Sequence, residues 1–201
     1  MAMILASQSP RRRELLGQMG FSFTVRPAKG EELPHPELTP AQLVEELARQ
    51  KALEVSAGAD ADDVVVAADT VVAVDGTVLG KPRDRAHAAE MLSALSGREH
   101  TVYTGVAVKR GETLLVEHEA TQVRFRPLTE REIDLYIQTG EPMDKAGSYG
   151  IQGYGALLVE GIRGDYFNVV GLPICRLGRM LAQVGEDALA QCAQKCAEKE
   201  R

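Results

Sequence analysis

The run Val64-Val65-Val66-Ala67-Ala68-Asp69-Thr70 gives the strongest indication of fold class. Its first five residues are apolar without alternation, which is typical of a strand that is buried on both faces. Strand and helix patterns alternate on either side of this run. The sequence therefore predicts an α/β fold, and it places the Asp69 carboxylate where a core strand ends and reaches the surface, the place at which open α/β sheets bind ligands.

The same alternation continues toward the N-terminus. Thr39 is a good N-cap, and Gln42 is placed to complete a capping box with it. The expected elements are a strand at residues 3–6, a helix at 11–19, a strand at 21–27 and a helix at 40–57.

Toward the C-terminus the pattern is more strand-rich. Asp75-Gly76 predicts a tight hairpin turn, and Thr129 with Glu132 forms a second capping box. The glycine-punctuated residues 147–155 are expected to form a loop that permits a close approach by a ligand or strand. The remaining expected elements are strands at 71–74, 78–79, 101–109, 113–125 and 156–162, helices beginning after Asp84 and at Pro173, and a charged helix or frayed tail over 186–201.

Length and composition exclude several classes of protein. The chain has 201 residues, of which 44% are hydrophobic and 26% are charged, as expected for one globular domain or two small lobes with a shared core. Its net charge is -6, and only 4% of its residues are aromatic, with no tryptophan. A surface of this kind repels nucleic acid and has little material for base stacking, so we expect no nucleic-acid partner.

The cysteines and the apolar runs indicate a soluble cytoplasmic protein. Cys175, Cys192 and Cys196 have neither zinc-site nor disulfide spacing, which fits free thiols in a reducing compartment. The N-terminus lacks the pattern of a signal peptide, and no apolar run is long enough to span a bilayer. We therefore expect no membrane partner.

Three arginines open the first predicted helix. Arg11, Arg12 and Arg13 lie at the positive end of the helix dipole, where each cation is unfavourable by a few tenths to about 1 kcal/mol. A bound polyphosphate would offset this cost, with Ser7 and Ser9 as hydroxyl donors. On this interpretation, removal of the Arg12 charge leaves the free protein unchanged or slightly more stable. Alternatively, the arginines point to solvent or pair with Glu14.

Other residues are candidates for metal or phosphate chemistry. Asp69 suits a metal ligand or general base, and Glu31 and Glu32 could complete an oxygen-ligand site for Mg²⁺ or Mn²⁺. The alternatives are a turn residue for Asp69 and a solvated acidic pair for the glutamates. Lys51 and Lys81 could bind phosphate or lie at the surface. The sequence contains neither a P-loop nor a dinucleotide-binding fingerprint, and the four histidines are expected at the surface.

A series of ordered motifs lies within residues 3–184: LASQSPRRRELL at residues 5–16, ADTVV at 68–72, LGKP at 79–82, MLSALSG at 91–97, GEPMDKAGSYGIQG at 140–153 and VGLP at 170–173. Together these motifs resemble the Maf family of nucleoside triphosphate pyrophosphatases. Gln8, where the family often has Gly or Ser, and Arg13, where it often has Lys or Gln, are small departures outside the positions assigned to catalysis.

The resemblance implies both a fold and an activity. The fold would be an elongated mixed β-sheet flanked by helices, with two lobes and a central cleft, similar to the inosine triphosphate pyrophosphatases. The block at residues 140–153 is similar to the branch that hydrolyses dTTP and UTP to the monophosphate and pyrophosphate with a divalent metal cation. The domain would span residues 1–184, leaving 185–201 as a tail without an assigned role. A homodimer is compatible with the resemblance.

The resemblance also assigns roles to individual residues. Asp69 would accept the proton of the attacking water and bind metal, with Glu32 as a second candidate ligand. If Asp69 bound the metal directly, metal-bound hydroxide could be the base instead. Lys51 and Lys81 would assist catalysis. The residues around the triphosphate and base would be Ser7, Arg11, Arg12, Thr70 and Gln152, of which Arg11, Thr70 and Gln152 would select the base.

Two other classes of function use similar features. A nucleotidyltransferase would use the same polyphosphate site but pass the nucleotide to an acceptor other than water. A regulator of cell division would bind nucleotides or proteins without turnover.

Overall fold

The computed structural model describes residues 2–30, 35 and 37–199. The described chain contains a seven-stranded mixed sheet in the order β2-β1-β3-β5-β6-β7, with β4 paired to β3. The two pairings of β1, with β2 and β3, are parallel, and the others are antiparallel. The strands are β1 (Met3–Leu5), β2 (Phe23–Val25), β3 (Val64–Val74), β4 (Thr77–Leu79), β5 (Glu99–Arg110), β6 (Thr113–Phe125) and β7 (Val159–Arg163).

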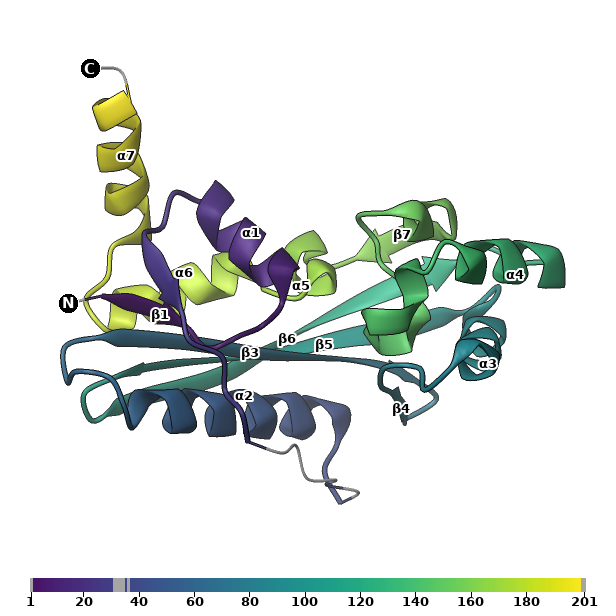
Figure 1. The fold of residues 1–201 in the computed structure, drawn as a ribbon, viewed down its shortest axis with the longest axis horizontal. Coiled ribbons are helices and arrows are strands. Elements are labelled where there is room, and N and C mark those ends of the chain that lie inside the picture. The colour runs from purple at the N-terminus through teal and green to yellow at the C-terminus, as the bar shows by residue number, and fades with distance from the viewer. Residues whose placement is uncertain (1, 31–34, 36, 200–201) are drawn as a thin grey trace.

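Helices cover both faces of the long strands (Figure 1). The expected α/β alternation is confirmed, although the short helix α5 had no clear signal in the sequence. The helices are α1 (Pro10–Gln18), α2 (Pro40–Ser56), α3 (Arg85–Leu95), α4 (Glu130–Gln138), α5 (Tyr166–Val170), α6 (Ile174–Gln183) and α7 (Ala188–Lys199), with the 3₁₀ turns η1 (Glu141–Asp144), η2 (Ala146–Ser148) and η3 (Tyr154–Leu157).

Local sequence signals fix several of these elements. Thr39 with Gln42 and Thr129 with Glu132 form the two expected capping boxes. Asp75 and Gly76 both have positive φ, at 50° and 77°, as a two-residue type I′ hairpin turn requires. Among the described residues, no helix is both long and apolar enough to cross a bilayer.

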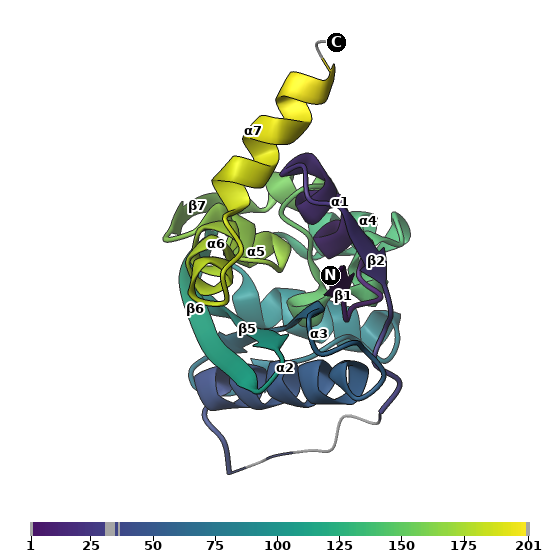
Figure 2. The same cartoon turned by 90° about the vertical axis from the view of Figure 1, so that its left-hand side faces the viewer.

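The described residues form three separate apolar cores along the elongated molecule. One face of the sheet packs under α1 and α6, and the opposite face packs on α2 through Ala48, Ala52 and Val55. The two views agree that α2 lies on the side of the sheet opposite α1 and α6 (Figures 1 and 2). The third core lies at the far end, between α3, α4 and the ends of β3, β5 and β6, and includes Phe125. The long strands therefore join two lobes.

β3 corrects one expectation from the sequence. It does not end at Ala68 but continues to Val74, because β5 pairs with it without a break from Val65 to Ala73. Asp69 thus lies in mid-strand. The opposite edge of β3 is interrupted instead: β1 pairs with residues 64–66 and β4 with residues 72–74, which leaves residues 67–71 with no strand partner on that edge in the described chain.

His100 is a second correction. The histidines were all expected at the surface, but His100 is 2% exposed and its Nε2 lies 2.8 Å from the Tyr149 hydroxyl. Burial lowers the pKa of His100 to about 4. A neutral imidazole can be buried in an apolar core because it carries no charge and has a hydrogen-bond partner there.

Candidate active site

The open edge of β3 borders a cavity of ≈ 1320 Å³, large enough for a nucleoside triphosphate. It lies between the two lobes and receives side chains from β3, α1, α2, the loop after β4 and the glycine-rich segment after α4. All predicted site residues except Glu32 line it: Ser7, Arg11, Arg12, Lys51, Asp69, Thr70, Lys81 and Gln152. Glu32 lies outside the described residues.

Asp69 and Lys51 form an ion pair at this cavity. Lys51 Nζ donates to Asp69 Oδ1 at 2.6 Å, and both side chains are largely buried. Asp69 Oδ2 has no hydrogen-bond partner among the described residues, so one carboxylate oxygen is fixed by the ammonium and the other retains its lone pairs.

Gly105 explains how α2 brings Lys51 to Asp69. Gly105 in β5 lies directly opposite Asp69, and a Cβ there would be 2.1 Å from the carbonyl oxygen of Val44 in α2. Only glycine permits this close approach of helix and strand. Lys51 lies seven residues after Val44, about two helical turns, and so shares the face of α2 that meets the sheet.

Asp69 and Thr70 point to opposite faces of β3, as successive strand residues do. Asp69 faces α2, whereas Thr70 faces α1, where Arg12 Nη2 donates to the Thr70 hydroxyl at 2.9 Å. Because the edge of β3 is open here, a ligand in the cavity can reach both faces of the strand.

The Arg12 guanidinium contacts the protein on several sides. It donates to the Thr70 hydroxyl, the Ser7 hydroxyl and two backbone carbonyl oxygens, at 2.7 Å to Gly171 and 2.7 Å to Ala68. The Ala68 carbonyl points to the same open edge as that of Val66, which accepts from the backbone of Ala6. Arg12 therefore binds this edge where a further strand would otherwise pair.

Arg11 crosses the cavity. Its Nη1 lies 3.4 Å from Asp144 Oδ2 in η1, and Lys145 Nζ donates to the other oxygen, Oδ1, at 2.6 Å. Although burial opposes it, the contacts with Lys145 and Arg11 hold the pKa of Asp144 below its ordinary value. This contact differs from the alternative pairing with Glu14, which accepts from Gln18 instead.

The glycine-rich segment closes the second lobe around the cavity, as expected. Gly147 has φ +67° and packs against Val72 of β3, with its N–H donating to the Gly80 carbonyl at 3.0 Å. The Glu141 carboxylate fixes the rest of the segment, because it accepts hydrogen bonds from the Tyr136 hydroxyl and from the backbone N–H groups of Tyr154 and Gly155. Although burial opposes it, these bonds keep the pKa of Glu141 below its ordinary value.

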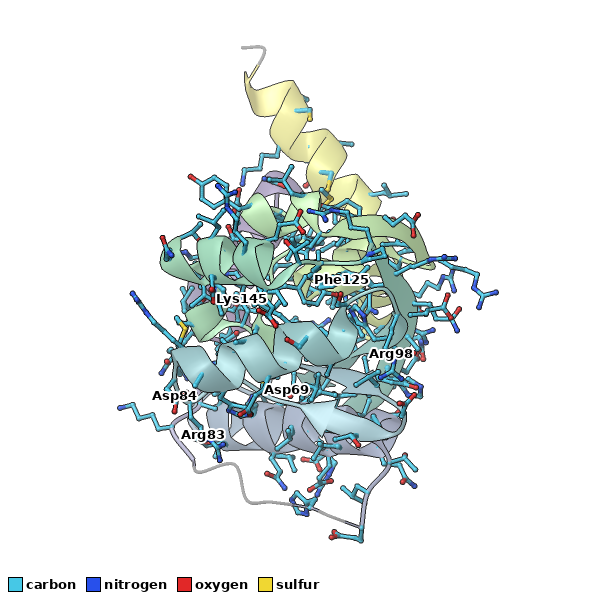
Figure 3. All side chains as sticks on the ribbon, turned by 90° about the vertical axis from the view of Figure 1, so that its right-hand side faces the viewer. Asp69, Arg83, Asp84, Arg98, Phe125 and Lys145 are labelled. Atoms are coloured by element: carbon cyan, nitrogen blue, oxygen red, sulfur yellow. The ribbon has the colours of Figure 1, made fainter. Side chains whose placement is uncertain are left out.

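The balance of charge suits an anionic ligand. The described residues that line the cavity include the cations Arg11, Arg12, Lys51, Lys81 and Lys145 and only three carboxylates, on Asp69, Glu141 and Asp144. Asp69 belongs to β3 and Lys145 directly follows η1; both residues are labelled in Figure 3. A chain with net charge -6 therefore has the locally basic pocket that a polyphosphate requires.

Several contributors had no assigned role before the structure was known. Lys145 lies within the matching block at residues 140–153, and an isolated glycine within a strand pattern, such as Gly105, is a general signal of close backbone approach. Gly171 lies within the matching block at residues 170–173, whereas Thr104 gave no signal, because its partner Thr70 on β3 is distant in sequence.

The described donors do not form a metal cage. Among them, no three His, Cys, Asp or Glu side chains gather closely enough to hold a metal ion. Mg²⁺ in phosphate sites needs only one or two carboxylates, because the substrate phosphates supply further ligands. Asp69 fits such a role.

A family model for Maf-like proteins matches residues 2–184. The chain belongs to the Maf family. It is 56% identical over 187 residues to a dTTP/UTP pyrophosphatase from Symbiobacterium thermophilum, with 91% of this chain and 94% of that protein covered. A dTTP/UTP pyrophosphatase from Moorella thermoacetica is 55% identical over 188 residues, with coverage of 92% and 96%. The resemblance found in the sequence is confirmed.

The Maf fold is also similar to a more distant solved structure. The Staphylococcus aureus Ham1 protein aligns with a TM-score of 0.54 at 12% identity, covering 91% of this chain and 99% of that one. A similarity at this identity concerns the fold alone, and it confirms the elongated mixed α/β architecture. Residues 185–201, including α7, lie outside the Maf match.

Proposed function

We propose that this chain is a nucleoside triphosphate pyrophosphatase that hydrolyses dTTP and UTP to the monophosphate and pyrophosphate. The observation that carries the proposal is the convergence of a carboxylate, Asp69, and several cationic side chains on one nucleotide-sized cavity. Relatives that cover nearly the whole chain at 55–56% identity are named dTTP/UTP pyrophosphatases, which gives the substrate class.

Asp69 acts as proton acceptor in this proposal. Its Oδ2 takes a proton from a water molecule whose oxygen attacks the α-phosphorus, while Lys51 holds Oδ1 at 2.6 Å. A bond forms between the water oxygen and phosphorus, and the bond from the α-phosphorus to the oxygen that bridges to the β-phosphorus breaks. The electron pair leaves with pyrophosphate.

The cations stabilise the charge that develops on the phosphate oxygens. Lys51 and Lys81 enter the cavity from α2 and from the loop after β4, so they can contact different parts of a triphosphate. Ser7 accepts hydrogen bonds from the Ser9 backbone and from Arg12, both at 3.2 Å. Its own hydroxyl proton is then directed to a further acceptor, as a phosphate oxygen would provide.

A divalent cation, Mg²⁺ or Mn²⁺, is part of the proposal. Asp69 would hold it, with Glu32 as a second candidate ligand and the phosphate oxygens completing the shell. If Asp69 binds the cation directly through Oδ2, that oxygen does not take the proton, and Asp69 acts as a ligand rather than as the base. When bound, the cation would neutralise phosphate charge and polarise the reacting phosphoryl group.

In this proposal, base choice follows from hydrogen-bond chemistry at Arg11, with Gln152 as a second contact to the base. Uracil and thymine present the O4 acceptor, whereas cytosine presents an amino donor at that position. Arg11 can only donate, so cytosine would leave a mismatch of about 1–3 kcal/mol. The Gln152 amide can turn to suit either base.

A reducing, cytoplasmic location and a homodimer belong to the same proposal. Cys175, Cys192 and Cys196 are free thiols, which supports the location.

The experiment that tests the function is a panel of natural nucleoside triphosphates with Mg²⁺ or Mn²⁺, assayed for pyrophosphate and for orthophosphate. We expect dTTP and UTP to exceed CTP by about tenfold or more in kcat/KM, with purines worse because of size. Pyrophosphate release without an added acceptor excludes a nucleotidyltransferase. Orthophosphate as the primary product, CTP or GTP as the best substrate, or tight binding without turnover would contradict the proposal.

A further inference from the structure

Thr104 is a buried hydroxyl that the proposed reaction does not use. It lies in β5, directly opposite Thr70 of β3, and it is 0% exposed. Its Oγ1 is 2.9 Å from Thr70 Oγ1 and donates to the carbonyl oxygen of Asn168 at 3.0 Å. Thr70 is therefore linked through Thr104 to a backbone carbonyl that can only accept.

This linkage fixes the direction of the hydrogen bonds. A threonine hydroxyl has one proton and two lone pairs. Because Thr104 gives its proton to Asn168, the bond between the two threonines must use the proton of Thr70. Arg12 can only donate, and it occupies one lone pair of Thr70. Only the second lone pair remains, so Thr70 can accept a hydrogen bond from a ligand in the cavity but cannot donate one.

Ser7 binds the other side of the same Arg12 guanidinium, but its hydroxyl is left as a hydrogen-bond donor rather than as an acceptor. Both of its lone pairs accept, from Arg12 and from the Ser9 backbone, so its proton is the part left for a ligand. One Arg12 side chain thus lies between a hydroxyl that only donates and a hydroxyl that only accepts. A nucleotide offers matching groups at its two ends: phosphate oxygens accept, and the N3–H of uracil or thymine donates.

The geometry points to Thr104 as a positioning residue for base specificity. Because Thr104 accepts the one hydrogen bond that Thr70 can donate, Thr70 can accept from the N3–H of uracil or thymine but cannot donate to the N3 lone pair of cytosine. Thr104 acts through Thr70 and does not touch the substrate. The inference rests on the proposed hydrolysis of dTTP and UTP, and it adds a selection at N3 to the selection at O4 by Arg11.

Thr104→Val isolates this effect. Valine has nearly the shape of threonine and suits a strand, but it has no hydroxyl. The Asn168 carbonyl still accepts from the Gly171 backbone N–H at 3.0 Å, so the substitution leaves no buried carbonyl unpaired there. Thr70 can then rotate its proton toward the cavity. Thr104→Ser is the matched control, because it keeps the hydroxyl.

The experiment compares kcat/KM for dTTP, UTP and CTP in the wild type and in both variants, with thermal melts to confirm folding. We expect Thr104→Val to reduce the ratio of dTTP to CTP by about tenfold, mainly because CTP improves, whereas Thr104→Ser retains the wild-type ratio. An unchanged ratio in folded Thr104→Val, or an equal loss for both nucleotides, would overturn the inference. If the wild type itself releases no pyrophosphate from dTTP or UTP, the proposed function fails instead.

A second measurement does not depend on the variant. Methylation of N3 removes the donor, so the wild type should hydrolyse N3-methyl-dTTP at least about tenfold less efficiently than dTTP. The control for added size is the comparison of dTTP with dUTP, which differ only by the methyl group at C5. Equal efficiency with N3-methyl-dTTP and dTTP would show that N3–H is not recognised and would overturn the inference.

Discussion

Lys51 Nζ lies 2.6 Å from Asp69 Oδ1, with the lysine on α2 and the carboxylate on β3. The partner residue on β5 is glycine, and this absence of a side chain allows the helix to lie against the strand. Thr70, the next residue of β3, points the other way and binds Arg12. Consecutive residues of one strand therefore present their side chains on two different faces, to which the proposed function assigns proton transfer and base recognition.

Asp69→Asn should reduce kcat by a factor on the order of 10² or more, because the amide keeps the shape but has no basic oxygen. Its thermal melt should remain close to that of the wild type. The control is Asp62→Asn, an exposed carboxylate just before β3, which should leave kcat unchanged. Near-full activity of Asp69→Asn with excess divalent metal would show that Asp69 is neither the base nor an essential ligand.

Arg12→Ala should destabilise the free protein by about 2–4 kcal/mol, because it removes charge-assisted hydrogen bonds to the Ser7 and Thr70 side chains and to two backbone carbonyls. Urea unfolding without nucleotide measures this. The sign is opposite to the expectation from the helix dipole alone, which is worth less than these bonds. Exposed Arg13→Ala is the matched control and should change stability by less than about 0.5 kcal/mol.

The sequence predicted the elements better than the contacts between them. Capping boxes, hairpin turns and the buried run at residues 64–68 are local signals, and all of them appear in the structure. In the sequence, the polar residues Asp69 and Thr70 look like the end of an apolar strand. Hydropathy indicates whether side chains are buried, but it does not indicate whether the backbone continues to pair with a neighbouring strand. The backbone continues to pair with β5, and both side chains reach the cavity at an open edge.

Long-range pairs could not be predicted in the same way. Arg11 and Asp144 are 133 residues apart, and His100 meets Tyr149 across 49 residues. Hydrophobic periodicity within the sequence indicates neither of these two pairs. The family resemblance picks out eight residues that line one cavity, but it did not indicate that Arg12 binds two carbonyls and two hydroxyls of its own chain.

Gly105→Ala should cost at least about 2 kcal/mol of stability, because the new Cβ would lie 2.1 Å from the Val44 carbonyl oxygen and the backbone of α2 would have to move. The same movement should separate Lys51 from Asp69 and lower kcat/KM for dTTP. Gly161→Ala in β7 is the control, since nothing lies within 4 Å of a Cβ built there. If Gly105→Ala unfolds at the same urea concentration as Gly161→Ala, α2 does not depend on this contact.

His100 should give the protein a pH-dependent stability in a defined window. Burial lowers its pKa from the ordinary 6.5 to about 4, so between these values the unfolded chain binds a proton that the folded chain does not. Stability therefore decreases as the pH falls through this window, by about 2 kcal/mol between pH 7 and pH 5. Carboxylates with a lowered pKa, such as Glu141, add to the loss only below about pH 4.5, their ordinary value.

Urea unfolding of the wild type and of His100→Gln at pH 7 and pH 5 measures this effect. Glutamine can still form a hydrogen bond with Tyr149 but does not titrate, so the difference between the two pH values should shrink even if the variant is less stable at both. The control is His87→Gln, which changes a histidine outside the three cores and should keep the wild-type pH dependence. A full pH dependence in His100→Gln would mean that His100 is not the group that takes up the proton on unfolding.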